Sequence, residues 1–420
     1  MGSEKGHRWT RLKRRMGRQR ISHSVSSVPS CKSLPPISET NSEQFSIPAA
    51  HTSSTTTEEV PCSSWDNFEY TNRLDEAVKH IQNDFVSGSK EMADSALATL
   101  STLIVAGSST AGDREELWNM VVWAAKKLCA ARPSMNAAMT SCLLRALNEI
   151  KQLWEILDEK RNKGADDLAA MARRQLVRIL EKRNEGGIRL GENFAERLKA
   201  YCRQRLDNAH TLTILTLGNS STIRAGILMI LSHLRFLHLN LLILESRPRF
   251  EGASMASQIL SSTCTENRAR LHVRILPDCA VGSVARNTNI LLLGADRISC
   301  SGDVSNKIGS LAAAICVKKL NPKAQVVVLS DADQIVANGM EETPKEIHSH
   351  SELSDAWGDD ARRGLAGRIG DGSVDVFGEW LEWVPAESID GYVTENGVLD
   401  KAGVARVAHK MKELREKMFV

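Results

Sequence analysis

The sequence predicts an α/β protein in which an all-helical N-terminal domain precedes a parallel-sheet domain. From Trp65 to about Arg205, apolar residues recur every three or four positions, as they do on the buried face of a helix. After Asp207 the pattern changes, and short β-type runs alternate with helical segments, which indicates βαβ units. The runs 291–293 and 326–329 are apolar throughout, which is typical of strands buried in a parallel sheet.

Composition and pattern divide the chain into four stretches. Residues 1–66 are basic at first and then rich in Ser, Thr and Pro, so we expect a disordered tail. Residues 67–205 carry the helical pattern, and residues 206–400 carry the alternating pattern, with a surface insertion at 341–375 where the alternation is lost. We expect residues 401–420 to form a C-terminal helix.

The composition argues against several classes of protein. The 42% hydrophobic and 25% charged fractions are ordinary for a soluble protein, and no apolar run approaches membrane-spanning length. A net charge of +3 is too small to indicate direct binding to nucleic acid. We therefore expect a cytoplasmic protein, although the Arg-rich and Ser-rich residues 1–30 also fit an organelle transit peptide.

The sequence predicts neither a metal nor a cofactor. The nine cysteines are scattered, with no Cys-x-x-Cys pair and no neighbouring His, which argues against zinc and for reduced thiols. His348 and His350 lie in the insertion without a third metal ligand in view. A dinucleotide is not favoured either, because no G-x-G-x-x-G motif follows the first strand.

Two features of the helical half lead to local predictions. The segment 131–135 contains a proline and breaks the helical pattern, and Ser134 is placed to cap the long helix that follows. Arg132 is then either a surface charge or, if this loop faces the pocket of the second half, a ligand-binding residue. The charged stretch 158–196, interrupted by Gly186-Gly187, predicts an exposed pair of helices.

Polar residues follow every predicted strand of the second half at its carboxyl end, where α/β sheets bind ligands. They are Asn219, Ser220 and Ser221 after the first strand, Arg247 after the second, Asp278 after the third, Asp296 after the fourth and Asp331 after the fifth. Carboxylates can act as acid and base while cations hold an anion, so we predict a site for a phosphorylated small molecule. The alternatives are a tight turn with a serine cap at Ser220 and a solvated loop arginine at Arg247.

The stretch 294–309 holds the densest set of these residues. Asp296 follows the apolar run 289–293, and residues 305–320 are predicted to form a helix. Asn306 and Lys307 would then lie at a helix start, a place that binds anions. The alternative is a polar connection with an aspartate turn and an asparagine helix cap.

Several segments together resemble one protein family. They are Glu245-Ser246-Arg247-Pro248, Gly294-Ala295-Asp296-Arg297, Gly302-Asp303, Asn306-Lys307-Ile308-Gly309, residues 377–385, and residues 131–135 in the helical half. The family joins the alpha, beta and delta regulatory subunits of eukaryotic translation initiation factor 2B with isomerases of methylthioribose 1-phosphate and ribose 1,5-bisphosphate. The resemblance covers about residues 67–400. It implies a helical domain, a Rossmann-like domain, and dimerisation through the latter.

The resemblance also implies how the two branches of the family differ. The isomerases resemble one another in an acid/base pair, a cysteine after the first strand and an aspartate in the Gly-Ala-Asp segment. Asp296 matches the aspartate, whereas Gly218 stands at the cysteine position and cannot exchange a proton. Cys279, at another strand end, is more typical of a packing residue. The sequence therefore favours a non-catalytic regulatory subunit with a retained sugar-phosphate or nucleotide pocket.

Two other functions stay open at this stage. One is an aldose–ketose isomerase that uses Asp296 with some other acid, and the other is a stand-alone paralogue that binds a metabolite. For the regulatory subunit, the resemblance implies a homodimer or heterodimer formed through the α/β domain. It also implies a guanine nucleotide exchange complex containing other initiation-factor-2B subunits and initiation factor 2.

Overall fold

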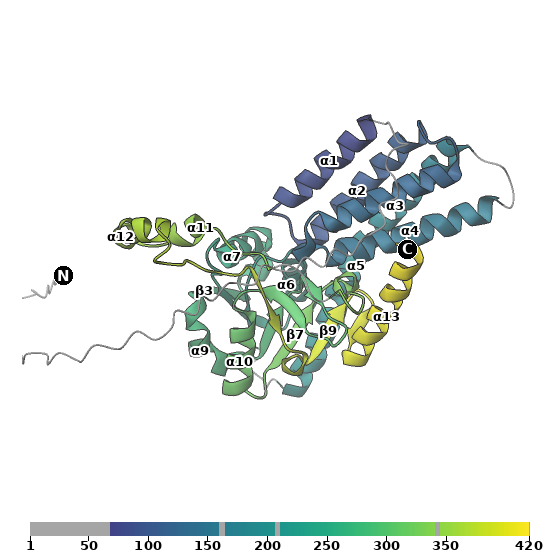
Figure 1. The fold of residues 1–420 in the computed structure, drawn as a ribbon. Helices are drawn as coiled ribbons and strands as arrows, with labels where there is room; N and C mark the ends of the chain where they lie inside the picture. The colour runs from purple at the N-terminus through teal and green to yellow at the C-terminus, as the bar shows by residue number, and fades with distance from the viewer. Residues whose placement is uncertain (1–67, 159–163, 206–210, 341–344, 420) are drawn as a thin grey trace, which may run out of the picture. The chain divides into compact units, whose positions relative to one another are not determined.

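The computed structural model describes residues 68–158, 164–205, 211–340 and 345–419 (Figure 1). It confirms the α/β fold, with a helical part that precedes a mostly parallel sheet. The described residues belong to one structural unit. The tail predicted at 1–66 lies outside the described residues.

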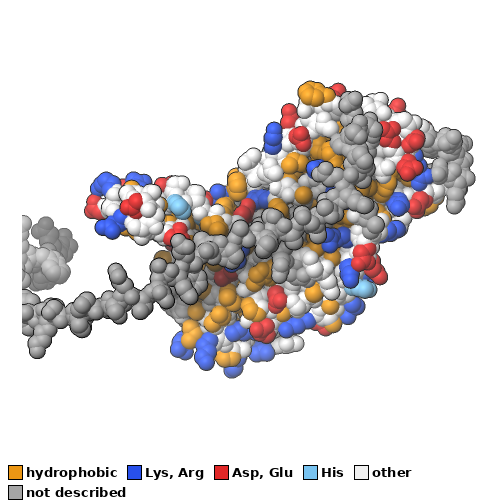
Figure 2. All heavy atoms as spheres, in the orientation of Figure 1, with side chains coloured by type: hydrophobic (Ala, Val, Ile, Leu, Met, Phe, Trp, Pro, Cys, Tyr) orange, Lys and Arg blue, Asp and Glu red, His pale blue; other side chains and the backbone are white. Residues whose placement is uncertain are grey.

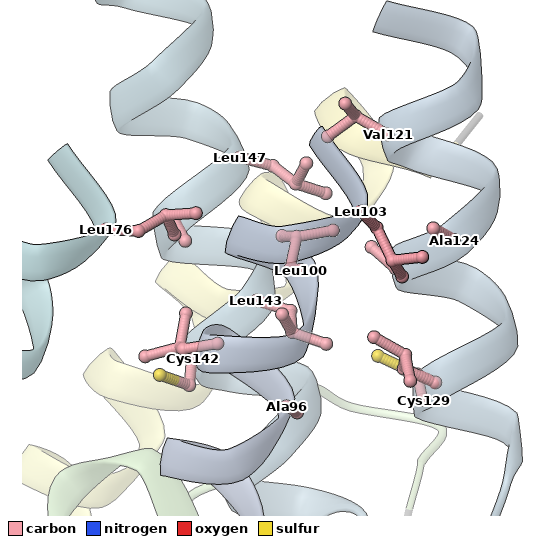
Figure 3. Packing of buried hydrophobic residues seen from close by; sticks show 14 of the residues in the cluster. Ala96, Leu100, Leu103, Val121, Ala124, Cys129, Cys142, Leu143, Leu147 and Leu176 are labelled. Atoms are coloured by element: carbon pink, nitrogen blue, oxygen red, sulfur yellow. The ribbon is translucent and has the colours of Figure 1, made fainter. Parts of the chain in front are cut away.

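The N-terminal part is a bundle of helices around one apolar core. Its elements among the described residues are α1 (Phe68–Asn83), α2 (Ser89–Ser108), α3 (Arg114–Ala130), the 3-10 turn η2 (Pro133–Met135), α4 (Ala137–Asp158) and α5 (Ala165–Arg205). The core side chains come from successive turns of these helices, as the spacing of the sequence predicts. Leu100 of α2, Val121 of α3, Leu147 of α4 and Leu176 of α5 lie together in it (Figure 3).

Two predictions for this part are wrong. The charged stretch 158–196 was expected to contain a helix pair, but α5 runs through Gly186-Gly187 without a break. Each glycine costs roughly 1 kcal/mol in a helix interior. The cost is offset because Leu176 anchors one end of α5 in the helical core and Phe194 anchors the other in the core under the sheet. Ser134 does not cap α4, since it lies inside η2.

The C-terminal part is built on a seven-stranded sheet with the strand order β10-β9-β7-β4-β1-β2-β3. Neighbouring strands are parallel except β9 and β10. The strands are β1 (Thr211–Thr216), β2 (His238–Leu244), β3 (Leu271–Leu276), β4 (Ile290–Leu293), β7 (Gln325–Leu329), β9 (Gly391–Thr394) and β10 (Gly397–Leu399). The central strands β4 and β7 are buried almost throughout, as the apolar runs 291–293 and 326–329 predict.

Helices cover both faces of this sheet, which explains why its central strands are apolar on both sides. The second half of α5, α6 (Ser221–His233) and α7 (Glu251–Ser262) build the core on one face. The short α9 (Val281–Val284), α10 (Ser310–Leu320) and α13 (Lys401–Met418) build the core on the other. The end of α13 also contributes Met411 and Met418 to the helical core, so the chain's last helix joins both parts.

A second, three-stranded sheet replaces part of a predicted helix. It contains β5 (Arg297–Ile298), β6 (Val304–Lys307) and β8 (Leu381–Val384), with β6 between the other two. The sequence suggested one helix over 305–320, but α10 begins only at Ser310, after Gly309 turns the chain with a φ of 100°. Asn306 and Lys307 therefore lie on a strand that pairs with residues some 75 positions away, a partner that local periodicity does not reveal.

The region of the predicted insertion carries two short helices and folds back on itself. They are α11 (His350–Ser354) and α12 (Asp359–Gly370), and charged side chains crowd this end of the molecule (Figure 2). Residues 346–348 and 378–380 run antiparallel, and the backbone N–H of Trp380 donates a hydrogen bond to the backbone oxygen of Glu346 at 3.0 Å. This pairing brings both residues to the cavity described below.

Arg297, part of the Gly-Ala-Asp-Arg segment, holds the two parts of the chain together. Its guanidinium donates to the backbone oxygens of Met340 and Pro133, the latter at 2.8 Å, and to Asn136 Oδ1 at 2.9 Å. The side chain is 2% exposed, so removing it leaves several acceptors buried without a donor.

We expect Arg297→Met to lower the free energy of unfolding by about 2–4 kcal/mol, measured by urea denaturation. Arg286→Met removes an exposed arginine from the same part of the chain and serves as the matched control. Equal denaturation midpoints for the two variants would show that the Arg297 contacts contribute little.

Candidate functional site

A cavity of about 390 Å³ opens at the carboxyl ends of β1, β4 and β7, which are neighbours in the sheet. The loops after these strands form one side of it. Another side is formed by residues 85–91, from the loop after α1 and the first turn of α2, and by Arg132, beside η2. The volume is within the range of small-molecule sites, and the position is the one that α/β folds use for ligands.

Most of the predicted site residues line this cavity. They are Arg132, Gly218, Asn219, Ser220, Ser221, Asp296, Asn306, Lys307 and Asp331. Some of these polar groups also stabilise their own loop. The Ser220 hydroxyl accepts from the Ile223 N–H at the start of α6, and Asn219 Oδ1 accepts from Arg224.

Arg247 and Asp278 do not line the cavity, so their predicted place in the cluster is wrong. Arg247 is exposed, pairs with Glu245 at 2.9 Å and lies over the Phe250 ring. The Asp278 carboxylate accepts from the backbone N–H groups of Ser246 and Arg247, both at 2.8 Å, and so fixes the loop after β2. That loop turns Arg249, two residues further on, toward the cavity instead.

Asp296 is the central carboxyl group of the cavity. It follows β4 directly, is partly buried, and its backbone N–H donates to Ser305 O at 2.9 Å. Burial, together with the charge of Glu251, raises the pKa of Asp296 to about 6, while Lys307 and Arg132 oppose the shift. A carboxyl group with this pKa exists in both protonation states near neutral pH, as proton transfer requires.

The raised pKa of Asp296 predicts a pH-dependent cost to stability. The unfolded chain loses this proton near the ordinary pKa of 3.8, whereas the folded chain keeps it up to about 6. The contribution of Asp296 to stability is therefore greatest below the lower value and is lost as pH rises through the upper one. We expect Asp296→Asn, which stays neutral, to match the wild type near pH 4 and to be more stable than it above about pH 6. Urea denaturation across this range tests the prediction, which a pH-independent difference would contradict.

Among the cations that line the cavity, Lys307 best fits the predicted role of an anion-binding group. Its ammonium lies 2.7 Å from Glu251 Oε2 and 4.9 Å from the centre of the Trp380 ring, and its side chain is 9% exposed. The Lys307–Glu251 contact is an ion pair by distance but is not aligned as a hydrogen bond. The N–H groups of Lys307 therefore keep hydrogen-bonding capacity for a ligand inside a poorly solvated site.

The start of α10 is not the anion site that the sequence suggested. The Glu382 carboxylate accepts from the backbone N–H groups of Gly309, at 2.5 Å, and Leu311, at 3.0 Å. A side chain of the protein therefore already neutralises this helix N-terminus. Asn306, next to it, donates to the Ser310 hydroxyl at 2.8 Å while it lines the cavity.

An aromatic and cationic wall closes one side of the cavity, and the sequence did not predict most of it. The Trp380 indole stacks on His348 at 4.3 Å, and the Arg249 guanidinium lies 4.3 Å from the same ring. Phe85 packs against Trp380 and against Arg132. Burial lowers the pKa of His348, although Glu352, which accepts at its Nδ1, opposes the shift. Arg132 and Trp380 were signalled in advance, because each falls in one of the family segments, whereas Phe85 and Arg249 were not.

Asp331 is a second carboxyl group with an unusual environment. It follows β7, lines the same cavity and is 9% exposed. Burial, together with the charge of the nearby Glu395, raises the pKa of Asp331 to about 6. Two carboxyl groups of near-neutral pKa therefore face one cavity, from adjacent strands of the sheet.

Gly218 lines the cavity without a side chain. Its φ of +74° is one that glycine adopts readily, and its N–H donates to the Ser246 hydroxyl at 2.8 Å. No cysteine is among the described residues that line the cavity. Cys279, the thiol considered as a substitute, is exposed and lies elsewhere.

The structure offers no metal site at the two histidines of the insertion. Among the described residues, no group of three His, Cys, Asp or Glu side chains could hold a metal ion. Likewise, no helix among the described residues is long and apolar enough to cross a membrane.

The helical part and the parallel sheet with helices on both faces define an α/β protein with a polar cavity at the carboxyl ends of its strands. The chain belongs to the Initiation factor 2 subunit family, whose family model matches residues 85–401. This match confirms the family that the sequence segments suggested. Solved structures of similar fold include the translation initiation factor eIF-2B of Pyrococcus horikoshii OT3 and eIF2B beta of Chaetomium thermophilum.

The two structures are 17% and 15% identical to the chain, with TM-scores of 0.54 and 0.56, so they support the fold alone. They cover 78% and 81% of this chain, and 96% and 92% of theirs. Sequence relatives include proteins named methylthioribose-1-phosphate isomerase. The one from Natranaerobius thermophilus is 25% identical over 66% of this chain and 73% of its own. A putative one from Pyrococcus furiosus is 26% identical over 78% and 84%.

Proposed function

We propose that the chain binds a phosphorylated sugar in the cavity and interconverts its aldose and ketose forms. The observation that carries this proposal is Asp296, a carboxyl group of near-neutral pKa placed in a cavity beside Lys307. The relatives named methylthioribose-1-phosphate isomerase support the same class of reaction. They favour catalysis over the regulatory role that the glycine at position 218 suggested.

The residues divide between binding and proton transfer. Lys307 holds the phosphate, because its ammonium has unused hydrogen-bonding capacity in a poorly solvated site. Asp296 transfers a proton at the sugar carbons that change oxidation state. A pKa of about 6 allows Asp296 to accept and return that proton without a large free-energy penalty.

The missing thiol at Gly218 leaves the second proton-transfer group to be supplied from elsewhere in the cavity. Asp331 fits this role, because it lines the same cavity from the adjacent strand β7 and its pKa is also about 6. Glu251 is less suitable, since its carboxylate is already paired with Lys307 at 2.7 Å. The reaction would thus use two carboxyl groups in place of a thiol and a carboxyl group.

Incubation of the purified chain with methylthioribose 1-phosphate or ribose 1,5-bisphosphate, followed by ³¹P NMR, tests the proposal. We expect the resonance of a ketose phosphate to appear and to grow with protein concentration. Both sugar phosphates remaining unchanged would contradict it.

The glycine at position 218 favours a second candidate function, a non-catalytic regulatory subunit of the initiation-factor-2B type. In that case the cavity senses a sugar phosphate or nucleotide, and binding stabilises an assembly without turnover. The partners would be other initiation-factor-2B subunits and initiation factor 2, with a homodimer or heterodimer formed through the α/β domain in the cytoplasm. Affinity purification from cell extract distinguishes the candidates, because only the regulatory subunit is expected to retain these partners.

A further inference from the structure

Arg132 is engaged by a carboxylate in the geometry that a phosphate would adopt. Its Nε lies 2.8 Å from Glu346 Oε1 and its Nη2 lies 3.0 Å from Glu346 Oε2, so the pair is bidentate. Phosphate and carboxylate bind the same planar fork of a guanidinium. Both residues line the cavity, and the Arg132 side chain is only 6% exposed.

The remaining parts of the guanidinium are also constrained. Its Nη1 donates to the backbone oxygen of Asp84, and its Cζ lies 4.6 Å from the centre of the Phe85 ring. A ligand therefore reaches Arg132 in bidentate fashion only along the edge that Glu346 holds. Glu346 itself is 23% exposed, more than its partner, and can move away at lower cost.

The Glu346 carboxylate comes from the segment between β7 and β8, outside both sheets. Glu346 is positioned because its backbone oxygen accepts from Trp380 N–H at 3.0 Å, and Trp380 belongs to the aromatic wall. The insertion thus adds a negative charge to the cavity. Among the described lining residues, four cationic side chains face five acidic ones: Lys90, Arg132, Arg249 and Lys307 against Glu91, Glu251, Asp296, Asp331 and Glu346.

We propose that Glu346 is a specificity-determining residue that competes with the ligand's phosphate for Arg132. The inference rests on the proposed function, because it adds Arg132 to Lys307 as a second cationic partner of the sugar phosphate in the same cavity. A doubly charged phosphate displaces the carboxylate, since it brings more charge to the same guanidinium edge. Neutral sugars and singly charged sugar acids leave the Arg132–Glu346 pair intact and bind weakly.

Isothermal titration of the full-length chain with inorganic phosphate tests this inference without any reaction. We expect Glu346→Gln to lower the Kd for phosphate about tenfold, because it removes the competing charge. Glu379→Gln is the matched control. Glu379 lies on the same antiparallel pair of segments and forms an ion pair with the exposed Lys345, but it is not a lining residue. The control should leave the Kd unchanged.

Three results would overturn the inference. They are an unchanged or higher Kd in Glu346→Gln, the same gain in Glu379→Gln, and a gain that persists when Arg132 is also replaced by Gln. If Glu346→Gln does not fold, Glu346→Asp provides the test. Its side chain is one methylene too short for the bidentate pair, so the Kd should fall severalfold, and no change would again contradict the inference. A gain in phosphate affinity together with absent turnover would contradict only the proposed isomerase function.

Discussion

Asp296→Asn is expected to reduce ketose formation by about 10²–10⁴-fold in kcat, the range typical of losing a general acid/base group. The substitution keeps the shape and the hydrogen-bonding oxygen of the side chain but removes the group that exchanges a proton. Binding of the sugar phosphate should change much less, since Lys307 is retained. Steady-state rates followed by ³¹P NMR, together with a Kd from titration, separate the two effects.

Asp278→Asn is the matched control for this prediction. Asp278 also follows a strand of the sheet but lies outside the cavity, where it holds the loop after β2. We expect the control to keep most of the turnover. If Asp296→Asn were as active as the wild type, or if both variants lost activity equally, Asp296 would not be the proton-transfer group.

Lys307→Gln is expected to lower kcat/KM about 10–100-fold, mainly through a higher KM. The reason is the loss of a charge-assisted contact between the phosphate and Lys307, whose side chain is only 9% exposed. Lys318→Gln, which removes a lysine paired with Asp390 away from the cavity, should have no such effect.

A double variant separates binding of phosphate by Lys307 from simple neutralisation of Glu251. Lys307→Gln leaves Glu251 without its ion-pair partner, so part of the loss could arise from that repulsion. Adding Glu251→Gln removes the repulsion. We expect the double variant to remain impaired, whereas full recovery of KM would show that Lys307 does not contact the phosphate.

Much of the fold could be predicted from the sequence, because periodicity reports directly on local structure. The runs that became β4 and β7 are apolar at every position, and this pattern is found where both faces of a strand are buried. The helix predicted over 305–320 is wrong at its start, because residues 304–307 form the strand β6 through pairing with the distant β8. The helix break expected at Gly186-Gly187 does not occur for a related reason. Tertiary packing at both ends of α5 outweighs the low helix propensity of the two glycines.

The sequence predicted the residues of the candidate site that follow strands of the sheet. It missed most of those that distant segments bring to the cavity. Asp296 and Asp331 follow adjacent parallel strands, so topology alone brings them to one edge. Arg247 was predicted and Arg249 was missed because the sequence does not show which way the loop after β2 turns. Glu346 gave no signal, since its role comes from tertiary contacts with Trp380 and with the loop beside η2.

The position of a bound sugar phosphate tests the central claim most directly. A crystal structure of the chain with methylthioribose 1-phosphate or ribose 1,5-bisphosphate should place a phosphate oxygen within hydrogen-bonding distance of Lys307 Nζ. It should also place the first two sugar carbons within about 3.5 Å of the Asp296 carboxyl group, as proton transfer requires. A ligand bound elsewhere, or bound in the cavity with Asp296 out of reach of those carbons, would contradict the proposed reaction.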